Sequence, residues 1–266
     1  MKIAFIGGGV MAEAIIGGVL ASNLTPPEDI SVGEPVSERR EQLTKTHGLQ
    51  AFADNEYAIR GADLVILAVK PQSLPEVMPS LSAGLSPQQT VASIVAGATI
   101  ETLVSGLDQD SVVRIMPNTP AQIGAGMSVW TATAAVPGAM RHVVGDILRT
   151  LGDEVYVPDE KLIDMSTALS ASGPAYVFLF IEALIDAGVY LGMPREMASQ
   201  LALQTVAGST QLVRESGFHP AELANMVTSP GGTTAEALLI LEQGAFKGVV
   251  IGAVAAAYEK SKALGG

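Results

Sequence analysis

Cysteine is absent from this chain of 266 residues, which excludes disulfides, thiolate metal sites and cysteine nucleophiles. Histidine occurs only at His47, His142 and His219, too few and too scattered for a histidine metal cluster, so we expect no metal centre. Basic residues are also scarce: 15 Lys and Arg stand against 27 Asp and Glu, and the net charge is −12 at pH 7. Nucleic acids and anionic membrane surfaces select basic proteins, so we expect neither as a partner.

Charged residues of both signs make up only 16% of the chain, whereas apolar residues make up 48%. So few charges leave part of the surface apolar, which indicates that another subunit covers it. A strand-like segment begins at Lys2, so we expect no signal peptide. The most apolar helical segment, residues 175–191, carries Glu182 and Asp186 and is expected to be too short to span a bilayer. We therefore expect a soluble, cytoplasmic protein.

The start of the chain carries a dinucleotide-binding pattern. A β-branched run ends at Ile6, and Gly7-Gly8-Gly9-Val10-Met11-Ala12 follows it with the spacing G-x-G-x-x-A, ahead of a small, apolar helical stretch. In dinucleotide folds the first glycine allows a tight turn and the second lets a pyrophosphate approach bare backbone. The third small residue lets the helix pack closely against the sheet. The helix N-terminus then offers N–H groups to the phosphates. We expect a nucleotide site here, and a purely structural turn is the weaker alternative.

The chain changes character near residue 160. Before it, β-branched runs alternate with helical patterns, which is typical of a doubly wound, mainly parallel sheet. Strands are expected at residues 3–6, 30–32, 64–68, 91–95, 112–116, 127–130 and 154–157, with helices such as 37–46, 75–81 and 137–151. Helices alone are expected beyond it, at residues 161–169, 175–191, 195–216, 220–226, 234–243 and 246–264. The predicted fold is a Rossmann-like α/β domain over residues 1–160 and an all-helical domain over residues 161–266.

Several helices of the second half are apolar around most of their circumference, as in residues 249–257. A helix of that kind must be buried on more than one side. We therefore predict dimerisation through this half, with a large monomeric bundle as the alternative.

The residue after the second strand usually decides which dinucleotide binds, and here it is Glu34. Its carboxylate can accept hydrogen bonds from both adenosine ribose hydroxyls and repels a 2′-phosphate, so it favours NADH over NADPH. Arg39 and Arg40 follow closely enough to reach such a phosphate, but we interpret them as an ordinary solvated helix face. Ligands of open α/β sheets lie beyond the strand ends, so Lys70 and Ala96 are expected to line the cofactor, although Lys70 could equally be a surface lysine.

Five segments in order over nearly the whole chain resemble the pyrroline-5-carboxylate reductase family, which makes L-proline by reducing a cyclic imine. They are residues 7–12, 68–72, 114–120, 170–176 and, most specific, 223–238 with Val-Thr-Ser-Pro-Gly-Gly-Thr-Thr. The resemblance implies NADH or NADPH as cofactor, pyrroline-5-carboxylate as a small-molecule substrate, and a homo-oligomer: a dimer through the C-terminal helices, with a ring-like decamer of five dimers as the larger assembly. Together with the glycine-rich pattern, it implies cofactor contacts at Ile6, Gly7, Gly8, Gly9, Val10, Met11, Ala12, Asn55, Ala68, Val69, Lys70, Pro71 and Ala96.

The last of these segments also makes chemical sense by itself. It is a turn that leads into a helix, and the free N–H groups of Gly232, Thr233 and Thr234 would form a small site for a carboxylate. A hydroxyl of Thr234 could hydrogen-bond the ring nitrogen of the substrate, and the resemblance assigns this catalytic role to the matching threonine of the family. A helix capped after a Pro-Gly-Gly turn is the simpler reading and does not exclude the functional one. The expected substrate set is Ser229, Gly231, Gly232, Thr233 and Thr234.

Two positions depart from the family and two rival functions stay open. Family members that prefer NADP often carry Asn-Arg-Ser-like residues where this chain has Glu34-Pro35, and Gly217 replaces a substrate-contacting Glu of some members. Asn55 could equally be a helix N-cap. A β-hydroxyacid dehydrogenase or imine reductase of related architecture would rely on a Lys or Asp in the long helix, where only Glu182 and Asp186 occur. A non-catalytic nucleotide-binding dimer would be expected to lose the segment around Thr234.

Overall fold

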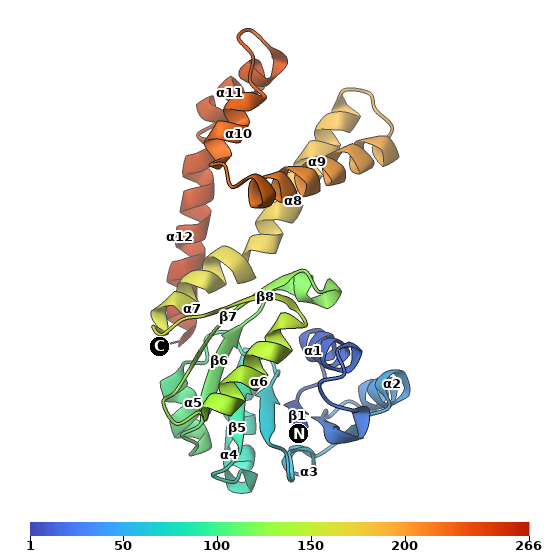
Figure 1. The fold of residues 1–266 in the computed structure, drawn as a ribbon, viewed down its shortest axis with the longest axis vertical. Helices are drawn as coiled ribbons and strands as arrows, with labels where there is room; N and C mark the ends of the chain where they lie inside the picture. The colour runs from blue at the N-terminus through green and yellow to red at the C-terminus, as the bar shows by residue number, and fades with distance from the viewer. Residues whose placement is uncertain (266) are drawn as a thin grey trace. The chain divides into compact units, whose positions relative to one another are not determined.

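The computed structural model describes residues 1–265, which form two compact units (Figure 1). The second unit is Gly173–Ala256, and the first comprises Met1–Ser172 together with the described residues from Ala257 onward. The boundary expected at residue 160 therefore falls inside the first unit. The reason is that helix α7 (Lys161–Ser166) packs on the sheet, where its Ile163 is fully buried.

The first unit contains an eight-stranded sheet with the order β3-β2-β1-β4-β5-β6-β7-β8. Neighbouring strands are parallel except for β6 and β7, so the prediction of a mainly parallel, doubly wound sheet is confirmed. Its strands are β1 Ile3–Ile6, β2 Ile30–Gly33, β3 Gln50–Phe52, β4 Leu64–Leu67, β5 Thr90–Ser93, β6 Val112–Met116, β7 Gly126–Ala132 and β8 Gly152–Tyr156. The short β3 was not expected, because its three residues include only one strong β-former.

Helices flank this sheet on both faces (Figure 1). Strand β1 shows why: Ile3 and Phe5 face one hydrophobic cluster and Ala4 and Ile6 face the other, so the strand reads as a continuous apolar run. The first cluster includes residues of α1 Val10–Ala21, α2 Ser37–His47 and α6 Gly138–Arg149. The second includes residues of α3 Asn55–Ile59, α4 Leu74–Gly84 and α5 Ile100–Leu107.

The described residues of the second unit contain helices and no strand, as predicted. The helices are α8 Gly173–Tyr190, α9 Arg195–Ser216, α10 Pro220–Met226, α11 Thr233–Gln243 and α12 Phe246–Gly265, the last of which continues into the first unit. Few of their side chains are buried by this chain alone: α8 and α11 contain no buried residue.

The apolar helix around α8 is longer than the sequence indicated. With α7 and the short π-helix η4 (Thr167–Ala171) it forms one helical run, Lys161–Tyr190, whose length and composition alone would allow it to cross a membrane. The expectation that it is too short is therefore wrong. The bent pair α11 and α12 passes the same test only when the two are taken together. Helices that are buried between protein subunits are equally apolar.

A buried arginine joins several segments of the first unit. Arg114 of β6 is only 1% exposed and donates hydrogen bonds of 2.7 Å to the carboxylates of Glu160 and Asp164. The same Glu160 oxygen accepts the N–H of Ile100 at 2.8 Å, at the start of α5. Asp164 also lies 3.5 Å from the hydroxyl of Ser261, near the end of α12. One guanidinium thus connects β6, α5, α7 and α12.

Replacing Arg114 with Met should lower the free energy of unfolding by about 3–5 kcal/mol, the usual cost of breaking a buried ion pair. The substitution leaves two neighbouring carboxylates without their shared partner. Urea unfolding followed by circular dichroism measures the effect. Arg195→Met is the control, because Arg195 pairs with Asp186 at the surface, where the two side chains are 65% and 57% exposed; it should cost at most about 1 kcal/mol. Equal losses in both variants would contradict the role of Arg114.

Candidate functional site

The C-terminal ends of four parallel strands lie side by side at one edge of the sheet. Ile6 of β1 pairs with Gly33 of β2 and Leu67 of β4, and Leu67 pairs with Ser93 of β5. The residues that follow these strands leave the sheet at the same edge, which is where an open α/β sheet binds its ligand. The structure therefore brings together the cofactor residues predicted from four separate segments: Gly7–Ala12, Glu34, Ala68–Pro71 and Ala96.

The glycine-rich turn meets the three requirements of a dinucleotide fingerprint. Gly7 has a φ of +92°, and a Cβ added to it would lie 2.8 Å from the carbonyl oxygen of Ala68. A Cβ on Gly9 would project into open space, which leaves room for a ligand against the backbone. Ala12 is fully buried in the cluster between α1 and the sheet. Helix α1 has no side-chain cap, so its first N–H groups fit the phosphates of a dinucleotide.

Glu34 is held beside this turn by backbone hydrogen bonds. One carboxylate oxygen accepts the N–H of Gly8 at 2.9 Å, and the other accepts the N–H of Val36 at 3.0 Å. Gly8 itself is buried, and a Cβ there would lie 2.6 Å from Leu43 of α2. Each oxygen of Glu34 keeps further acceptor capacity, so the carboxylate can still bind ribose hydroxyls.

The two arginines of α2 do not form a freely solvated face. Arg39 donates to the carbonyl oxygen of Gly8 at 2.6 Å and to the carboxylate of Glu13 at 2.7 Å. Arg40 donates to the carbonyl oxygens of Glu34 and the following proline, both at 2.8 Å. Our interpretation of these residues from the sequence is therefore wrong. Glu13 was not among the site residues predicted from the sequence. The signal that could have identified it is a carboxylate in the first turn of the helix that follows the glycine-rich pattern.

Asn55 lies beside the end of β2. Its side-chain oxygen sits so close to Gly33 that a Cβ on Gly33 would collide with it. The N-cap of α3 is Asp54, whose side chain accepts the N–H of Glu56 at 2.9 Å, and Asn55 is the first helical residue. The capping role considered for Asn55 is therefore wrong, and its side chain lies against Gly33, the last residue of β2.

The other two strand ends differ in their surroundings. Lys70 is exposed and precedes the short 3-10 helix η2 (Pro71–Ser73). Ala96 is half-buried and packs on the small cluster around Met116. The loop that carries Ala96 packs against α12: a Cβ on Gly97 would lie 2.8 Å from the carbonyl oxygen of Leu264. No pattern in the sequence indicates this contact between residues so far apart in the chain.

The predicted substrate residues lie in the second unit. Gly231 has a φ of +66°, and α11 begins at Thr233 with Gly232 as its N-cap and no side-chain cap. The N–H of Gly232 donates to the carbonyl oxygen of Ser229 at 3.0 Å, so our expectation that it is free is wrong. The N–H groups of Thr233 and Thr234 remain for a carboxylate. The side chain of Thr234 is half-buried and that of Thr233 is exposed.

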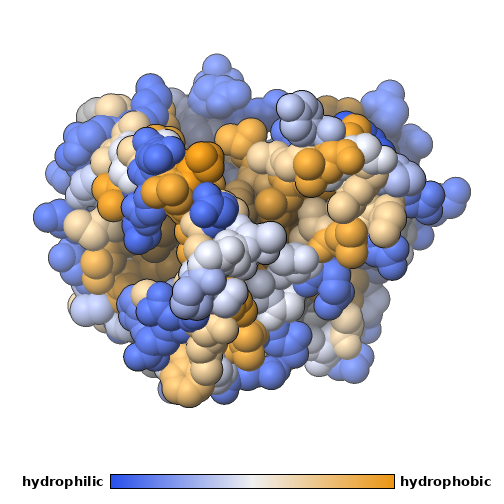
Figure 2. All heavy atoms as spheres, turned by 90° about the horizontal axis from the view of Figure 1, so that it is seen from above, coloured by the Kyte–Doolittle hydropathy of each residue, from blue (hydrophilic) through white to orange (hydrophobic). Residues whose placement is uncertain are grey.

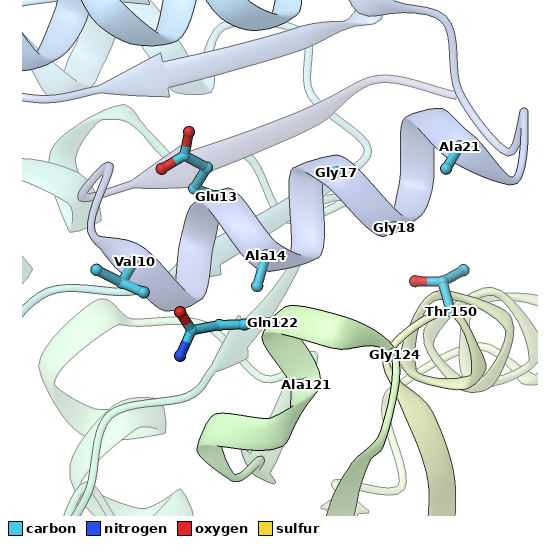
Figure 3. Close-up of a pocket in the computed structure, with 10 residues that line it drawn as sticks. All are labelled: Val10, Glu13, Ala14, Gly17, Gly18, Ala21, Ala121, Gln122, Gly124 and Thr150. Atoms are coloured by element: carbon cyan, nitrogen blue, oxygen red, sulfur yellow. The ribbon is translucent and has the colours of Figure 1, made fainter. Parts of the chain in front are cut away.

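A hollow of about 420 Å³ runs along α1 next to the glycine-rich turn (Figure 3). Ala14 and Gly17 of α1 line one side of it, and Gln122 and Thr150 line the other. Of the predicted cofactor residues its lining includes Val10. This hollow is therefore mostly separate from the nucleotide edge, the edge of the sheet where the predicted cofactor residues after β1, β2, β4 and β5 lie. Among the described residues, no group of three or more His, Asp and Glu side chains could hold a metal ion.

Two protein families match parts of the chain. Residues 160–264 match the family described as pyrroline-5-carboxylate reductase dimerisation, starting where the sequence indicated a boundary. Residues 2–97 match the family described as NADP oxidoreductase, coenzyme F420-dependent.

Named relatives match the chain over its whole length. It is 44% identical over 265 residues to a pyrroline-5-carboxylate reductase of Synechocystis sp., covering 100% of this chain and 98% of the relative. Among solved structures, the pyrroline-5-carboxylate reductase of Coxiella burnetii superposes with a TM-score of 0.91 at 35% identity. The Plasmodium falciparum pyrroline carboxylate reductase, solved with NADP bound, gives 0.91 at 36% identity. Both comparisons cover 100% of this chain and 98% of the other.

Replacing Gly9 with Ala should weaken NADH binding at least about tenfold, or ~1.4 kcal/mol, while thermal stability stays unchanged. The φ of −67° at Gly9 suits alanine, but the added methyl group would occupy the space that a pyrophosphate needs. Titration of NADH followed by nicotinamide fluorescence measures the effect. Gly17→Ala adds a methyl group to equally open space farther along α1 and should bind NADH like the unmodified protein. Equal affinities in the two variants would show that the phosphates do not lie at Gly9.

Proposed function

The chain belongs to the pyrroline-5-carboxylate reductase family, and we infer that it reduces L-1-pyrroline-5-carboxylate to L-proline with NADH or NADPH, the last step of proline biosynthesis. The observation that carries this inference is the agreement with a named reductase over 100% of the chain. That agreement spans both the nucleotide edge and the turn before α11. It favours the reductase over a hydroxyacid dehydrogenase, an imine reductase of another kind or a non-catalytic scaffold.

A bound reduced nicotinamide supplies the hydride that the C=N carbon of the substrate accepts. The chain itself binds and orients the reactants. The uncapped start of α1 and the open backbone at Gly9 would hold the pyrophosphate, and Ala96 would offer a small side chain at the strand edge for the flat ring. The N–H groups of Thr233 and Thr234 bind the substrate carboxylate at the positive end of α11.

The hydroxyl of Thr234 lies in the first turn of the same helix as this carboxylate site. The substrate ring is small, so a carboxylate bound there places the ring nitrogen within reach of a neighbouring hydroxyl. That nitrogen gains electron density as the C=N bond accepts hydride, and a hydrogen bond aimed at it stabilises the transition state more than the ground state. The imine nitrogen takes its proton from solvent, so the reaction needs no side chain as a general acid.

Replacing Thr234 with Ala should lower kcat/KM for pyrroline-5-carboxylate by about ten- to a thousandfold, the range for losing one positioned hydrogen bond to developing charge. Nucleotide affinity should stay the same, because Gly7–Ala12 belongs to the other unit. Initial rates of nicotinamide oxidation measure the first quantity, and fluorescence titration without substrate measures the second.

Thr234→Ser is the matched control, since it keeps the hydroxyl and removes only the methyl group. It should retain most of the activity. If Thr234→Ala has the kcat/KM of the unmodified enzyme, Thr234 has no part in the reaction and only the backbone site for the carboxylate remains. If serine and alanine reduce activity equally, the methyl group matters and the hydroxyl does not.

The family uses NAD(P)H, and we propose that this member prefers NADH. The support is the carboxylate of Glu34, which two backbone N–H groups fix at the strand edge where the adenosine ribose would lie. A 2′-phosphate there would meet a negative charge that cannot easily move away. The relative solved with NADP bound has the same fold, so the preference depends on local residues and not on architecture.

Initial rates should give a kcat/KM for NADH at least about tenfold above that for NADPH, as expected for one close repulsion of ~1.4 kcal/mol. Glu34→Ser should reduce this ratio by removing the repulsion. Glu38→Gln removes a charge from an exposed side chain of the same region and should leave the ratio unchanged. An equal ratio in the unmodified enzyme and in Glu34→Ser would mean that another residue discriminates between the nucleotides.

We also propose that the enzyme is a cytoplasmic homodimer formed through the C-terminal helices. Seen from above, the surface carries broad apolar areas (Figure 2). In α8, Phe178 and Leu179 are 61% and 67% exposed in the single chain. A groove of about 290 Å³ between α8 and α12 has an almost wholly apolar lining, including Phe180 and Phe246. Helices from a second copy would cover these surfaces, and a decamer of five dimers is the larger assembly we propose.

A further inference from the structure

Arg39 of α2 is hydrogen-bonded to the backbone of the glycine-rich turn, and every nitrogen of its guanidinium has a partner. Its Nε donates to the carbonyl oxygen of Gly8 at 2.6 Å. One terminal nitrogen donates to Glu13 at 2.7 Å and the other to Gln42 at 3.0 Å. Glu34 accepts the N–H of the same Gly8. The cation Arg39 therefore binds the carbonyl oxygen of Gly8, and the anion Glu34 binds the N–H of the same residue.

Glu13 is the group that fixes this arginine. Its second carboxylate oxygen lies 3.1 Å from Nε2 of His47, so the carboxylate bridges two side chains of α2. Burial raises the pKa of the Glu13 carboxyl, but the hydrogen bonds and charges of Arg39 and His47 outweigh it, and the pKa lies below its ordinary value. Figure 3 shows the side chain of Glu13 leaving α1 on the side away from Ala14 and Gln122.

Glu13 adds a negative charge close to the expected phosphate site. It lies in the first turn of the helix whose N-terminus receives the phosphates, where a second negative charge repels them. Its contribution is to neutralise Arg39 and to retain it beneath the turn. A free arginine so close to Glu34 would be a ready ligand for a 2′-phosphate, because a planar guanidinium binds phosphate through two hydrogen bonds.

We propose that Glu13 is a specificity-determining residue for the nucleotide: it binds Arg39 under the glycine-rich turn and so withholds it from the 2′ position. The inference rests on the nucleotide site and the NADH preference described above. Glu34 then excludes the 2′-phosphate by repulsion, and Glu13 excludes it by removing the cation that would attract it. Both carboxylates are needed for the full preference, and neither touches the reacting atoms.

The test uses binding of NADH and NADPH to the intact protein, followed by nicotinamide fluorescence without any imine substrate. Adding Glu13→Gln to Glu34→Ser should tighten NADPH binding about tenfold or more relative to Glu34→Ser alone, the effect of gaining one charge-assisted hydrogen bond. The affinity for NADH should change by much less. Adding Arg39→Met as a third substitution should abolish the gain, because Arg39 is the cation that is released.

The matched control is Glu34→Ser with Glu38→Gln, which removes one negative charge from an exposed side chain bonded to Ser37. A similar gain in this control would overturn the proposal in favour of a general charge effect. A gain that survives Arg39→Met but is lost with Arg40→Met would overturn it in favour of Arg40. No gain in the Glu13 variant, with a thermal midpoint like that of Glu34→Ser, would overturn it as well.

A second measurement covers the case in which the double variant does not fold. Glu13→Gln alone should raise the ratio of NADPH affinity to NADH affinity above that of the unmodified protein. If this ratio is unchanged in the single variant, the proposal is overturned. These titrations contain no pyrroline-5-carboxylate. A protein that binds nucleotides as described but does not reduce the imine would refute the proposed reaction and leave the role of Glu13 standing.

Discussion

A buried positive charge determines how the first unit closes. Arg114 can remain charged inside the sheet only if carboxylates accompany it, because an unpaired charge in the interior is very costly. The chain supplies both carboxylates after its last strand, on Glu160 and Asp164, so α7 must return to β6. Hydrophobic burial is not directional and would tolerate several placements of α7. The ion pairs select one, and through Ile100 and Ser261 they also fix the start of α5 and the end of α12.

The nucleotide edge follows the same logic on a smaller scale. Gly8 can be gripped on both sides because its neighbours carry opposite charges, Glu34 at its N–H and Arg39 at its carbonyl oxygen. A turn held in this way is organised before the nucleotide arrives, so less binding energy is spent on ordering it. The groups that give the turn its shape are thus also the groups to which we assign the preference between nucleotides.

Periodicity and glycine spacing were enough to predict the sheet apart from the short β3, the fingerprint and the helical second half. Strands such as β1 and β4 have only β-branched or apolar positions on two buried faces, and Gly7 occupies a φ that other residues avoid. The hydrogen-bond partners of individual groups could not be predicted in this way. Nothing periodic marks Glu13 as the partner of Arg39, and the turn before α11 did not reveal that Ser229 uses the N–H of Gly232. Such bonds depend on the angles at which elements pack, and a single sequence does not encode these in any pattern.

The return of α12 to the first unit makes the second unit an insertion within the first. During synthesis on the ribosome, the sheet emerges well before Ser261 and Leu264 do. Until the last helix leaves the exit tunnel, the loop of Ala96 lacks the support of Leu264, and Asp164 lacks Ser261. A nascent chain arrested before α12 already contains all eight strands of the sheet. The loop of Ala96 acquires its contact with Leu264 only when the last helix has been made.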